Sequence, residues 1–350
     1  MPDLIHPDTH LLRDLSSKID ATLSALIKPG QRVALVNFPN HANAGDSALW
    51  LGQVLALKRA GATFLYHSSW ASYRRDELAR ILKPDDLILI NGGGNFGDLY
   101  PLQQAATRLR LLRDFPAHRI IQLPQSIWFI HPENRDEVKR LCEAHRDFTL
   151  LVRDQQSLDE AKKHFNVPSQ LCPDMAFALG PLPRPVTPSL PILWLARQDP
   201  ESTGYTPPHD DPDIQVIDWL GSLPEDHNIP LASRLACMMN PPLHRRSMDP
   251  TKGTPRERKL LAATFHGMAR YWIHRGCCVL AKGHAVVTDR LHGHILCLLM
   301  GIPHVILDNS YGKLRSLHQT WTRTACTASW SNDPKHAADL ARSLRNDLRA

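Results

Sequence analysis

The feature that most restricts the fold is a regular alternation of short apolar runs with helical segments over residues 30–180. Runs such as "RVALVNF", "TFLYHS", "DLILI", "RIIQLPQS" and "FTLLVRD" are rich in β-branched and large apolar residues, which is typical of buried strands. The segments between them, such as "ALWLGQVLALKRAGA", carry apolar residues at helical spacing. This alternation predicts a mostly parallel sheet covered by helices on both faces, with ligands bound at the carboxyl ends of its strands.

A proline-rich segment separates this half from a second α/β unit. Residues 180–191 contain five prolines, which favours a semi-rigid linker. After it, "ILWLARQD", "AVVTD" and "PHVILD" are expected strands, and "RLHGHILCLLMG" is an expected helix. The polar, proline-broken residues 238–257 are expected to form a mobile loop. We therefore expect an N-terminal domain over residues 1–180, a linker over 181–191 and a C-terminal domain over 192–350.

Composition limits the classes of partner. Lysine and arginine number 41 against 35 acidic residues, a formal charge of +6, which suits phosphorylated substrates, an anionic membrane surface or nucleic acid. No basic run with interleaved aromatic residues is present, so nucleic acid is not an expected partner. The seven cysteines include no pair at C-x-x-C spacing, which argues against a disulfide framework or a structural zinc site.

The sequence predicts a cytoplasmic protein. Its first residues are charged and lack the apolar core of a secretory signal. The longest apolar stretch, Ile295–Ile302, is too short to span a bilayer. The basic excess leaves peripheral contact with the inner face of a membrane open.

The first candidate site is "NHANAGDSALW", which joins an expected strand to an expected helix. Asn43, Gly45 and Asp46 permit a tight turn, and Ser47 is placed to cap the helix. The backbone amides and Asp46 would then meet a substrate at the carboxyl end of the sheet. The alternative is a well-capped turn without a ligand.

The second candidate is the glycine cluster in "NGGGNFGDLY". Gly92, Gly93 and Gly94 allow a ligand to approach the backbone closely, and Asn91 and Asn95 flank them. The segment is not a Walker loop and lacks the G-x-G-x-x-G spacing of a dinucleotide site. A ligand loop and a tight crossover remain alternatives.

Three further strand ends carry polar side chains. Gln125 and Ser126 end "RIIQLPQS" and are able to bond hydroxyl groups, Arg153 ends "FTLLVRD", and Arg197 ends "ILWLA" at the start of the second unit. A capped turn is the alternative for Gln125 and Ser126, and a surface ion pair is the alternative for Arg153. An arginine at the end of a buried strand needs a carboxylate, either the protein's own or a ligand's.

The most informative segment is "VVTDRLHGHILCLLMGIPHVIL". If a helix begins after Asp289, then Arg290, Leu291, His292 and Gly293 lie at its N-terminus, where free N–H groups and the dipole favour an anion. His292 is then placed for acid or base chemistry, whereas His294 lies roughly 200° around the helix and is expected to pack or face solvent. The pair is a poor metal chelate, so no metal is expected.

One more cation belongs with this group. Lys313 follows "PHVILD", again at the carboxyl end of an expected strand. A lysine at the start of a helix is unfavourable for the helix dipole, which an anionic ligand would explain. The alternative is an exposed lysine.

Taken together, these segments resemble the polysaccharide pyruvyltransferase family. The family pattern has Asn-x-Gly-Asp after the first strand, a glycine triplet, an arginine opening the second domain, Arg-Leu-His-Gly before an apolar helix, Gly-Ile-Pro and a downstream lysine. The matching positions are Asn43, Gly45, Asp46, Gly92, Gly93, Gly94, Arg197, Arg290, Leu291, His292, Gly293, Gly301, Ile302, Pro303 and Lys313. The chain departs from the family at Asp289, where relatives often carry a small residue.

The resemblance implies an α/β fold of two Rossmann-like domains facing a cleft, like that of the GT-B glycosyltransferases. It implies phosphoenolpyruvate as donor, a sugar acceptor that is free, nucleotide-linked or part of a lipid-linked oligosaccharide, and a pyruvate ketal as product in exopolysaccharide biosynthesis. No nicotinamide or flavin cofactor is expected.

Residues and resemblance together give a set of site predictions. The predicted catalytic residues are Asp46, Arg197, Arg290 and His292. The predicted donor-binding residues, on the C-terminal domain, are Arg197, Arg290, Leu291, His292, Gly293 and Lys313. The predicted acceptor-binding residues, on the N-terminal domain, are Asn43, Asp46, Gly93, Gly94, Asn95, Gln125, Ser126 and Arg153. Two rival functions share these features: a GT-B nucleotide-sugar glycosyltransferase and a non-catalytic carbohydrate- or anion-binding protein.

Overall fold

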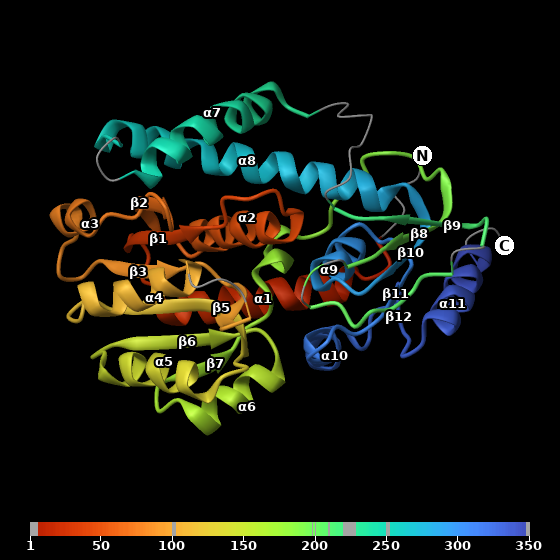
Figure 1. Cartoon of the computed structure of the whole chain (residues 1–350), viewed down its shortest axis with the longest axis horizontal. Coiled ribbons are helices and arrows are strands. Elements are labelled where there is room, and N and C mark those ends of the chain that lie inside the picture. Colours follow the sequence, from red (N-terminus) through yellow and green to blue (C-terminus); the bar gives the residue numbers. More distant parts are fainter. Residues whose placement is uncertain are drawn as a thin grey trace.

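The computed structural model describes residues 6–99, 103–197, 199, 201–208, 211–219, 229–249 and 253–347. Within them the chain forms two parallel sheets whose carboxyl ends face one another, with helices packed on their faces (Figure 1). The predicted α/β class with two Rossmann-like halves is confirmed.

The larger sheet comes from the N-terminal half and has the strand order β2-β1-β3-β5-β6-β7, with β4 also paired to β5. All pairings are parallel, as the strand–helix alternation predicted. The strands are β1 Arg32–Phe38, β2 Thr63–Ser69, β3 Leu87–Ile90, β4 Gly93–Gly97, β5 Ile120–Trp128, β6 Phe148–Val152 and β7 Ser169–Leu171.

Strand alternation divides the side chains of this sheet between two apolar layers. Val33 and Leu35 of β1 face α1 Thr9–Leu26 and α2 Ala44–Arg59, whereas Ala34 and Val36 face the opposite layer. The helices on that second side are α3 Arg75–Ile81, α4 Gln103–Asp114, α5 Pro132–Ala144 and α6 Gln155–His164. Because both faces are covered, the central strands β1, β3 and β6 are almost entirely apolar.

Two of the predicted site segments lie inside strands. The glycine cluster opens β4 at Gly93, and Gln125 and Ser126 lie within β5, which continues to Trp128. β5 pairs first with β3 and then with β4, so β4 prolongs the line of β3 beyond a break at Asn91 and Gly92. Register shifts in β5 between Gln122 and Gln125 accompany this break. The interruption turns polar groups toward the end of the sheet.

The smaller sheet has the order β12-β11-β10-β8-β9, again all parallel. Its strands are β8 Leu190–Leu195, β9 Ile214–Ile217, β10 Gly283–Thr288, β11 His304–Ile306 and β12 Ala328–Trp330. Helix α9 Leu291–Leu299 covers one face, and α11 Pro334–Asp347 packs on β8, β10 and β11 from the other. Short helices complete the half: α10 Lys313–Leu317 and η2 His318–Thr322, with η1 Met175–Leu179 between the sheets.

The loop predicted for residues 238–257 is wrong over most of its length. Helix α7, Leu231–Met248, runs through Pro241 and Pro242, and α8, Pro255–Ala281, begins with a capping box formed by Thr254 and Glu257. Proline in a helix interior loses a backbone hydrogen bond, but both prolines lie on the exposed side of a helix that packs along α8. Tertiary packing thus overrides the local signal.

The two halves share one apolar core. Helix α8, which leads into β10 of the smaller sheet, packs on α2 of the larger half (Figure 1). Its Phe265 stacks on Phe38 at the end of β1 with ring centroids 4.1 Å apart. On another side, Trp128 at the end of β5 stacks on Tyr311 with centroids 4.9 Å apart. Asp8, just before α1, accepts hydrogen bonds from Cys326 and Thr327 of the C-terminal half. These contacts hold the two sheets in one orientation.

Candidate active site

A polar cavity of about 290 Å³ lies between the carboxyl ends of the two sheets. This is the place where open α/β sheets bind ligands. Both halves contribute to its wall. The residues that line it are, in sequence order, Pro39, His41, Asn43, Asp46, Trp70, Asn91, Gly92, Gly93, Gly94, Asn95, Arg153, Arg197, Asp199, Glu201, Trp219, Arg290, Leu291, His292 and Lys313.

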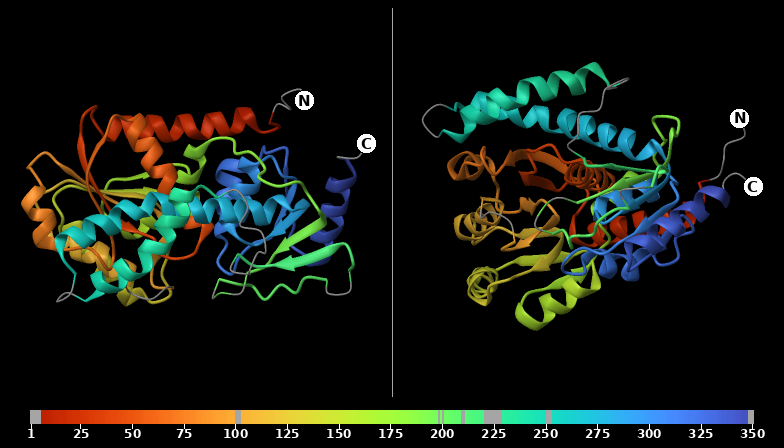
Figure 2. Two further views of the ribbon diagram at one scale, coloured as in Figure 1. Left: turned by 90° about the horizontal axis from the view of Figure 1, so that it is seen from above. Right: turned by 45° about the vertical axis from the view of Figure 1, so that its right-hand side comes forward.

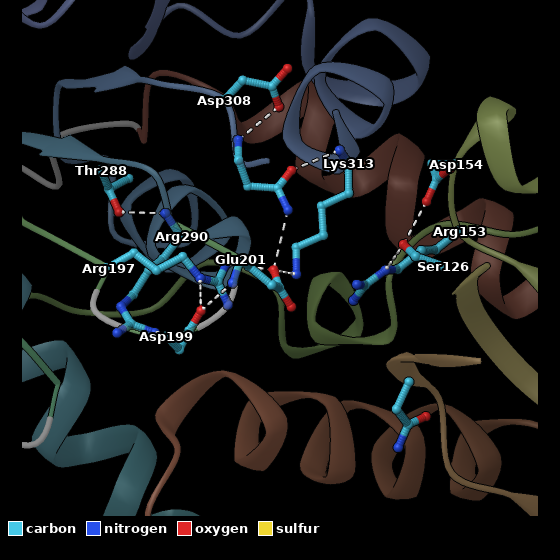
Figure 3. Close-up of polar contacts among 12 residues, drawn as sticks. Ser126, Arg153, Asp154, Arg197, Asp199, Glu201, Thr288, Arg290, Asp308 and Lys313 are labelled. Carbon is cyan, nitrogen blue, oxygen red and sulfur yellow. Dashed lines mark hydrogen bonds and ion pairs between the residues drawn. The ribbon is translucent and has the colours of Figure 1, made fainter. Parts of the chain in front are cut away.

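The C-terminal wall carries three cations. Arg197 follows β8, Arg290 is the N-cap residue of α9, and Lys313 is the first residue of α10. All three come from the carboxyl ends of neighbouring strands or the helices that follow them, and Figure 3 shows them together. Each is largely buried, because α9, α10 and the segment after β8 enclose them. Lys313 is therefore not the exposed lysine that was its alternative interpretation.

Carboxylates beside these cations hold them in place. Arg197 donates from Nε to Asp199 Oδ1 at 2.7 Å, and its Nη1 lies 2.7 Å from Glu201 Oε2. Lys313 Nζ also contacts Glu201, whose side chain is 2% exposed. The protein's own acids thus satisfy the strand-end arginine, which was one of the two alternatives.

Arg290 has a different set of partners. Its Nη2 donates to Asp218 Oδ1 at 2.7 Å, and its Nη1 donates to Asp199 Oδ2 at 3.4 Å. Its Nε is buried without a hydrogen-bond partner among the described residues. Since buried donors in folded proteins are nearly always paired, this N–H points to a ligand that completes the site.

Burial shifts the protonation of two groups in this wall. Desolvation lowers the pKa of Lys313 to about 8, although Glu201 works in the opposite direction. Desolvation also raises the pKa of Asp289 to about 6, even though Arg197 and Arg290 favour its charged form. Both groups therefore titrate much closer to neutrality than usual.

His292 reaches into the cavity from the first turn of α9. Its Nε2 lies 3.5 Å from Asp174 Oδ2, and its Nδ1 lies on the side of the ring that meets Gly45. The ring lies against Gly45 in the first turn of α2: a β-carbon on Gly45 would be 2.3 Å from His292 Nδ1. Position 45 therefore has to be glycine for His292 to occupy this place.

A fully buried ion pair stands behind His292. Arg153 Nη1 donates to Asp174 Oδ2 at 2.8 Å, and Arg153 Nε donates to Ser126 Oγ, which in turn donates to Asp154. Burial of Asp174 opposes its charged form, but His292 and Arg153 together hold its pKa well below the usual range. The Asp174 carboxylate is therefore charged, and it orients the His292 ring through its contact with Nε2. Arg153 is thus part of a buried network rather than the surface ion pair of the alternative interpretation.

The N-terminal wall is built mainly from backbone and amide groups. Asn95 N donates to Gln125 Oε1 at 3.2 Å, and Gln125 Nε2 donates to Asn95 Oδ1 at 2.9 Å. Gly93 has a φ of +135°, a conformation that side chains disfavour. A β-carbon on Gly94 would lie 3.0 Å from an Arg153 nitrogen, so the strand passes close to the buried arginine.

The start of α2 completes this wall. Asn43, not Ser47, caps the helix: its side chain accepts from Gly45 N at 2.9 Å and from Asp46 N at 3.4 Å. Asp46 is half-buried and lies 3.3 Å from His41 Nε2. The Asn-x-Gly-Asp run is thus both a capped turn and part of the cavity wall.

The structure brings most of the predicted site residues to one place. Three of them do not line the cavity but lie behind its wall: Gln125, Ser126 and Gly293. Gln125 bonds to Asn95, Ser126 accepts from Arg153, and Gly293 packs closely on Thr288. Asp174, Asp199, Glu201, Asp218 and the tryptophans Trp70 and Trp219 were missed. Asp199 and Glu201 stand two and four positions after Arg197, a spacing that could have signalled them.

His294 does not belong to the site. It is fully buried, contacts His304 Nε2 at 2.7 Å and Thr322 Oγ1 at 2.9 Å, and has a pKa lowered by burial. It is therefore packed, one of the two places expected for it. No group of three or more His, Cys, Asp or Glu in the described part of the chain is arranged to hold a metal ion. No helix in that part is long and apolar enough to cross a bilayer.

Comparisons with known proteins agree with this geometry. The family model "Polysaccharide pyruvyl transferase" matches residues 43–257 and 273–311. "Pyruvyl transferase 1" of Schizosaccharomyces pombe is 34% identical over 327 residues, covering 90% of this chain and 75% of that protein. "Putative pyruvyl transferase EpsO" of Bacillus subtilis is 28% identical over 316 residues, covering 89% of this chain and 92% of that protein.

A solved structure supports the fold alone. The crystal structure of an uncharacterized protein from Klebsiella pneumoniae superposes with a TM-score of 0.55 at 18% identity, covering 91% of this chain and 99% of that one. The family model spans well over half of the chain and includes the residues that line the cavity from Asn43 to Arg290 and His292. The chain therefore belongs to the polysaccharide pyruvyl transferase family and is a transferase.

Proposed function

We propose that the enzyme moves the pyruvyl group of phosphoenolpyruvate onto two hydroxyls of one sugar in a polysaccharide or its precursor, giving a pyruvate ketal and phosphate. The observation that carries the proposal is the set of three cations, Arg197, Arg290 and Lys313, gathered on one wall beside His292. The opposite wall offers amides and backbone groups that suit hydroxyls.

The charge of the donor fits the cationic wall. Phosphoenolpyruvate carries a carboxylate and a phosphate, and guanidinium groups bind both in a bidentate manner. The N-terminus of α9 adds free N–H groups and the positive end of a helix dipole beside Arg290. The unpartnered Nε of Arg290 is the donor best placed to gain a bond when the anion arrives.

The reaction joins two C–O bonds to one carbon. The first sugar hydroxyl adds to C2 of the donor and loses its proton, while C3 accepts a proton and becomes a methyl group. The bond from C2 to the phosphate oxygen then breaks, and phosphate leaves. The second hydroxyl bonds to C2 and loses its proton, which closes the ketal. Each step develops positive character at C2, so nearby carboxylates stabilise it electrostatically.

His292 is the group proposed to carry protons. Nδ1 is the nitrogen proposed to exchange the proton, since Nε2 faces the buried Asp174 carboxylate. A histidine oriented by a buried carboxylate is suited to give or take a proton at neutral pH. Asp46 and His41, on the other wall, are proposed to lie beside the acceptor hydroxyls.

The test is an incubation of the enzyme with phosphoenolpyruvate and a panel of hexose acceptors, free, nucleotide-linked and lipid-linked. We expect phosphate release that depends on the acceptor and a new methyl singlet in the proton NMR spectrum of the product. Arg290→Ala should fold and lose this activity by on the order of 10² to 10³ in rate.

Calorimetry separates the rivals. Phosphoenolpyruvate should bind, and Arg290→Ala should abolish that binding. Binding of a uridine diphosphate sugar without phosphoenolpyruvate would instead assign a glycosyltransferase. Binding without turnover on any acceptor, unaffected by His292→Ala, would assign a binding protein.

A further inference from the structure

Helix α7 buries its small and polar side chains and exposes its large apolar ones, the reverse of an ordinary surface helix. The residues that it buries are small or polar, Ser233, Ala236, Asn240 and Ser247, and they pack against α8. The packing is close: a β-carbon on Gly267 of α8 would lie 2.6 Å from the Ala236 side chain, and Asn240 donates to Thr264 at 2.9 Å. Water-facing helices normally have the reverse pattern. The outer face of α7 is therefore built to contact something else.

Large apolar side chains occupy that outer face. Leu231 is 70% exposed and Met238 is 72% exposed, and Leu235 and Met239 lie on the same side at helical spacing. Of the ten exposed large apolar residues in the described part of the chain, five are on α7, although it contributes only 18 residues. Figure 1 shows α7 as the outermost layer, on the side of α8 away from α2. Clustered exposed apolar side chains mark an interaction surface.

The same hairpin carries the basic excess of the chain. Residues 231–281 contain nine lysines and arginines and two acidic residues, a net charge of +7, whereas the whole chain carries +6. Helix α7 itself has no acidic residue. The rest of the protein is therefore close to neutral, and the basic excess lies within this segment of the chain.

Some of these basic side chains form ion pairs within the protein, and others do not. Arg246 contacts Glu257, and Arg258 contacts Glu77 of α3. Arg234, Arg245, Arg256 and Lys259 are exposed and have no carboxylate partner among the described residues. The surface thus combines unpaired positive charge with exposed methionine and leucine side chains.

We propose that the outer face of the α7–α8 hairpin docks on an anionic membrane surface. Basic and apolar side chains on one helix face are the combination that binds the boundary between headgroups and acyl chains. A second copy of the chain fits less well, because a twofold interface would bring two faces of like charge together. Nucleic acid would use the arginines but leave the exposed methionine and leucine side chains unexplained.

The hairpin lies beside the catalytic cavity. Trp70, which lines the cavity, meets the ring of His244 on α7 edge-on at 5.9 Å. Trp219, another lining residue, packs on Gly276 of α8, where a β-carbon would lie 2.9 Å from its ring. In the left view of Figure 2, the hairpin crosses the face of the molecule seen from above. Docking through α7 would therefore hold the cavity near the membrane.

Vesicle co-sedimentation tests the proposal without needing turnover. We expect the wild-type chain to bind vesicles of phosphatidylcholine mixed with phosphatidylglycerol, and to bind phosphatidylcholine alone far more weakly. Binding should fall as salt rises, because the charges are exposed. This readout is independent of the proposed reaction, so failure of one does not imply failure of the other.

Two double variants separate charge from apolar contact. Arg234→Ser with Arg245→Ser should weaken binding on the order of 30-fold, since each basic residue near a charged surface contributes about 1 kcal/mol, or about fivefold. Leu231→Ser with Met238→Ser should weaken it roughly tenfold. All four side chains are exposed, so thermal unfolding should remain unchanged.

Matched controls lie on other faces of the protein. Ile130→Ser with Val216→Ser removes exposed apolar side chains elsewhere, and Arg13→Ser with Arg140→Ser removes charge elsewhere. Both should bind vesicles like the wild type. The proposal is overturned if the wild type does not bind, if the controls weaken binding as much as the α7 variants, or if Met238→Ser abolishes a dimer seen by light scattering while vesicle binding is absent.

Discussion

Two arginines of the cavity wall, Arg153 and Arg290, pair with carboxylates in opposite ways. In the N-terminal wall, Arg153 and Asp174 are 1% and 0% exposed, sealed behind His292. In the C-terminal wall, Arg290 pairs with Asp218 and Asp199, whose side chains are 18% and 30% exposed. A sealed pair fixes geometry, because neither charge can leave its partner without being stranded. An open pair is able to exchange its carboxylate for the anion of a ligand.

The largest expected effect comes from breaking the sealed pair. Asp174→Asn should lower the free energy of unfolding by about 3 to 5 kcal/mol, because Arg153 stays buried without its counter-charge. Asp218→Asn is the matched variant in the open wall and should change stability by less than about 1 kcal/mol. Chemical denaturation of both variants measures the difference. Equal losses would mean that the two walls are not distinct.

The same pair predicts a pH dependence. The pKa of Asp174 is lower in the folded protein than its unfolded value of about 3.9. Its contribution to stability is therefore complete above about pH 4 and is lost as the pH falls through the folded pKa. Wild-type stability should drop more steeply in acid than that of Asp174→Asn, as urea unfolding at a series of pH values would show.

The next effect concerns the contact between the two walls. Gly45→Ala places a methyl group where the His292 ring lies, so the ring is displaced. We expect a loss of rate on the order of 10² to 10³, similar to that of His292→Ala. The double variant should be no worse than either single one, because both changes act on the same group. Additive losses, measured as phosphate release under saturating donor, would contradict this account.

A smaller effect is expected from Asp289. Its pKa of about 6 in the folded protein exceeds the unfolded value of about 3.9, so wild-type stability should fall as the pH rises between these two values. Asp289→Asn removes that decline and should be more stable at pH 7 by roughly 2 kcal/mol. Thermal unfolding across this range measures it. A wild type with no decline there would show that the buried carboxyl is stabilised in another way.

The smallest effect concerns donor affinity. Lys313 has a pKa of about 8, so its side chain is charged at neutral pH and loses its proton as the pH rises above that pKa. Phosphoenolpyruvate should bind about tenfold more weakly above pH 9 than at pH 7, which corresponds to about 1.4 kcal/mol. Lys313→Arg, which keeps its charge, should bind with little change over this range. Calorimetry at several pH values gives the answer.

Much of the architecture could be predicted because it depends on local patterns. Strand–helix alternation predicted both parallel sheets, and the run from Arg290 to Gly293 predicted a helix start at a site. Helix α7 was missed because Pro241 and Pro242 oppose a helix locally, and only packing on α8 restores it. The partners Asp174 and Asp218 were missed because each ion pair joins residues far apart in sequence, which no single segment records.

The missing side chain at Gly45 limits which protein halves could be joined to this one in a chimera. His292 belongs to one half of the molecule, and the space that it fills belongs to a helix of the other. A chimera that joins this C-terminal half to a foreign N-terminal half would keep a working histidine only where the foreign helix also lacks a side chain at that point. The two halves are therefore matched parts rather than exchangeable modules, and one absent β-carbon determines whether they are compatible.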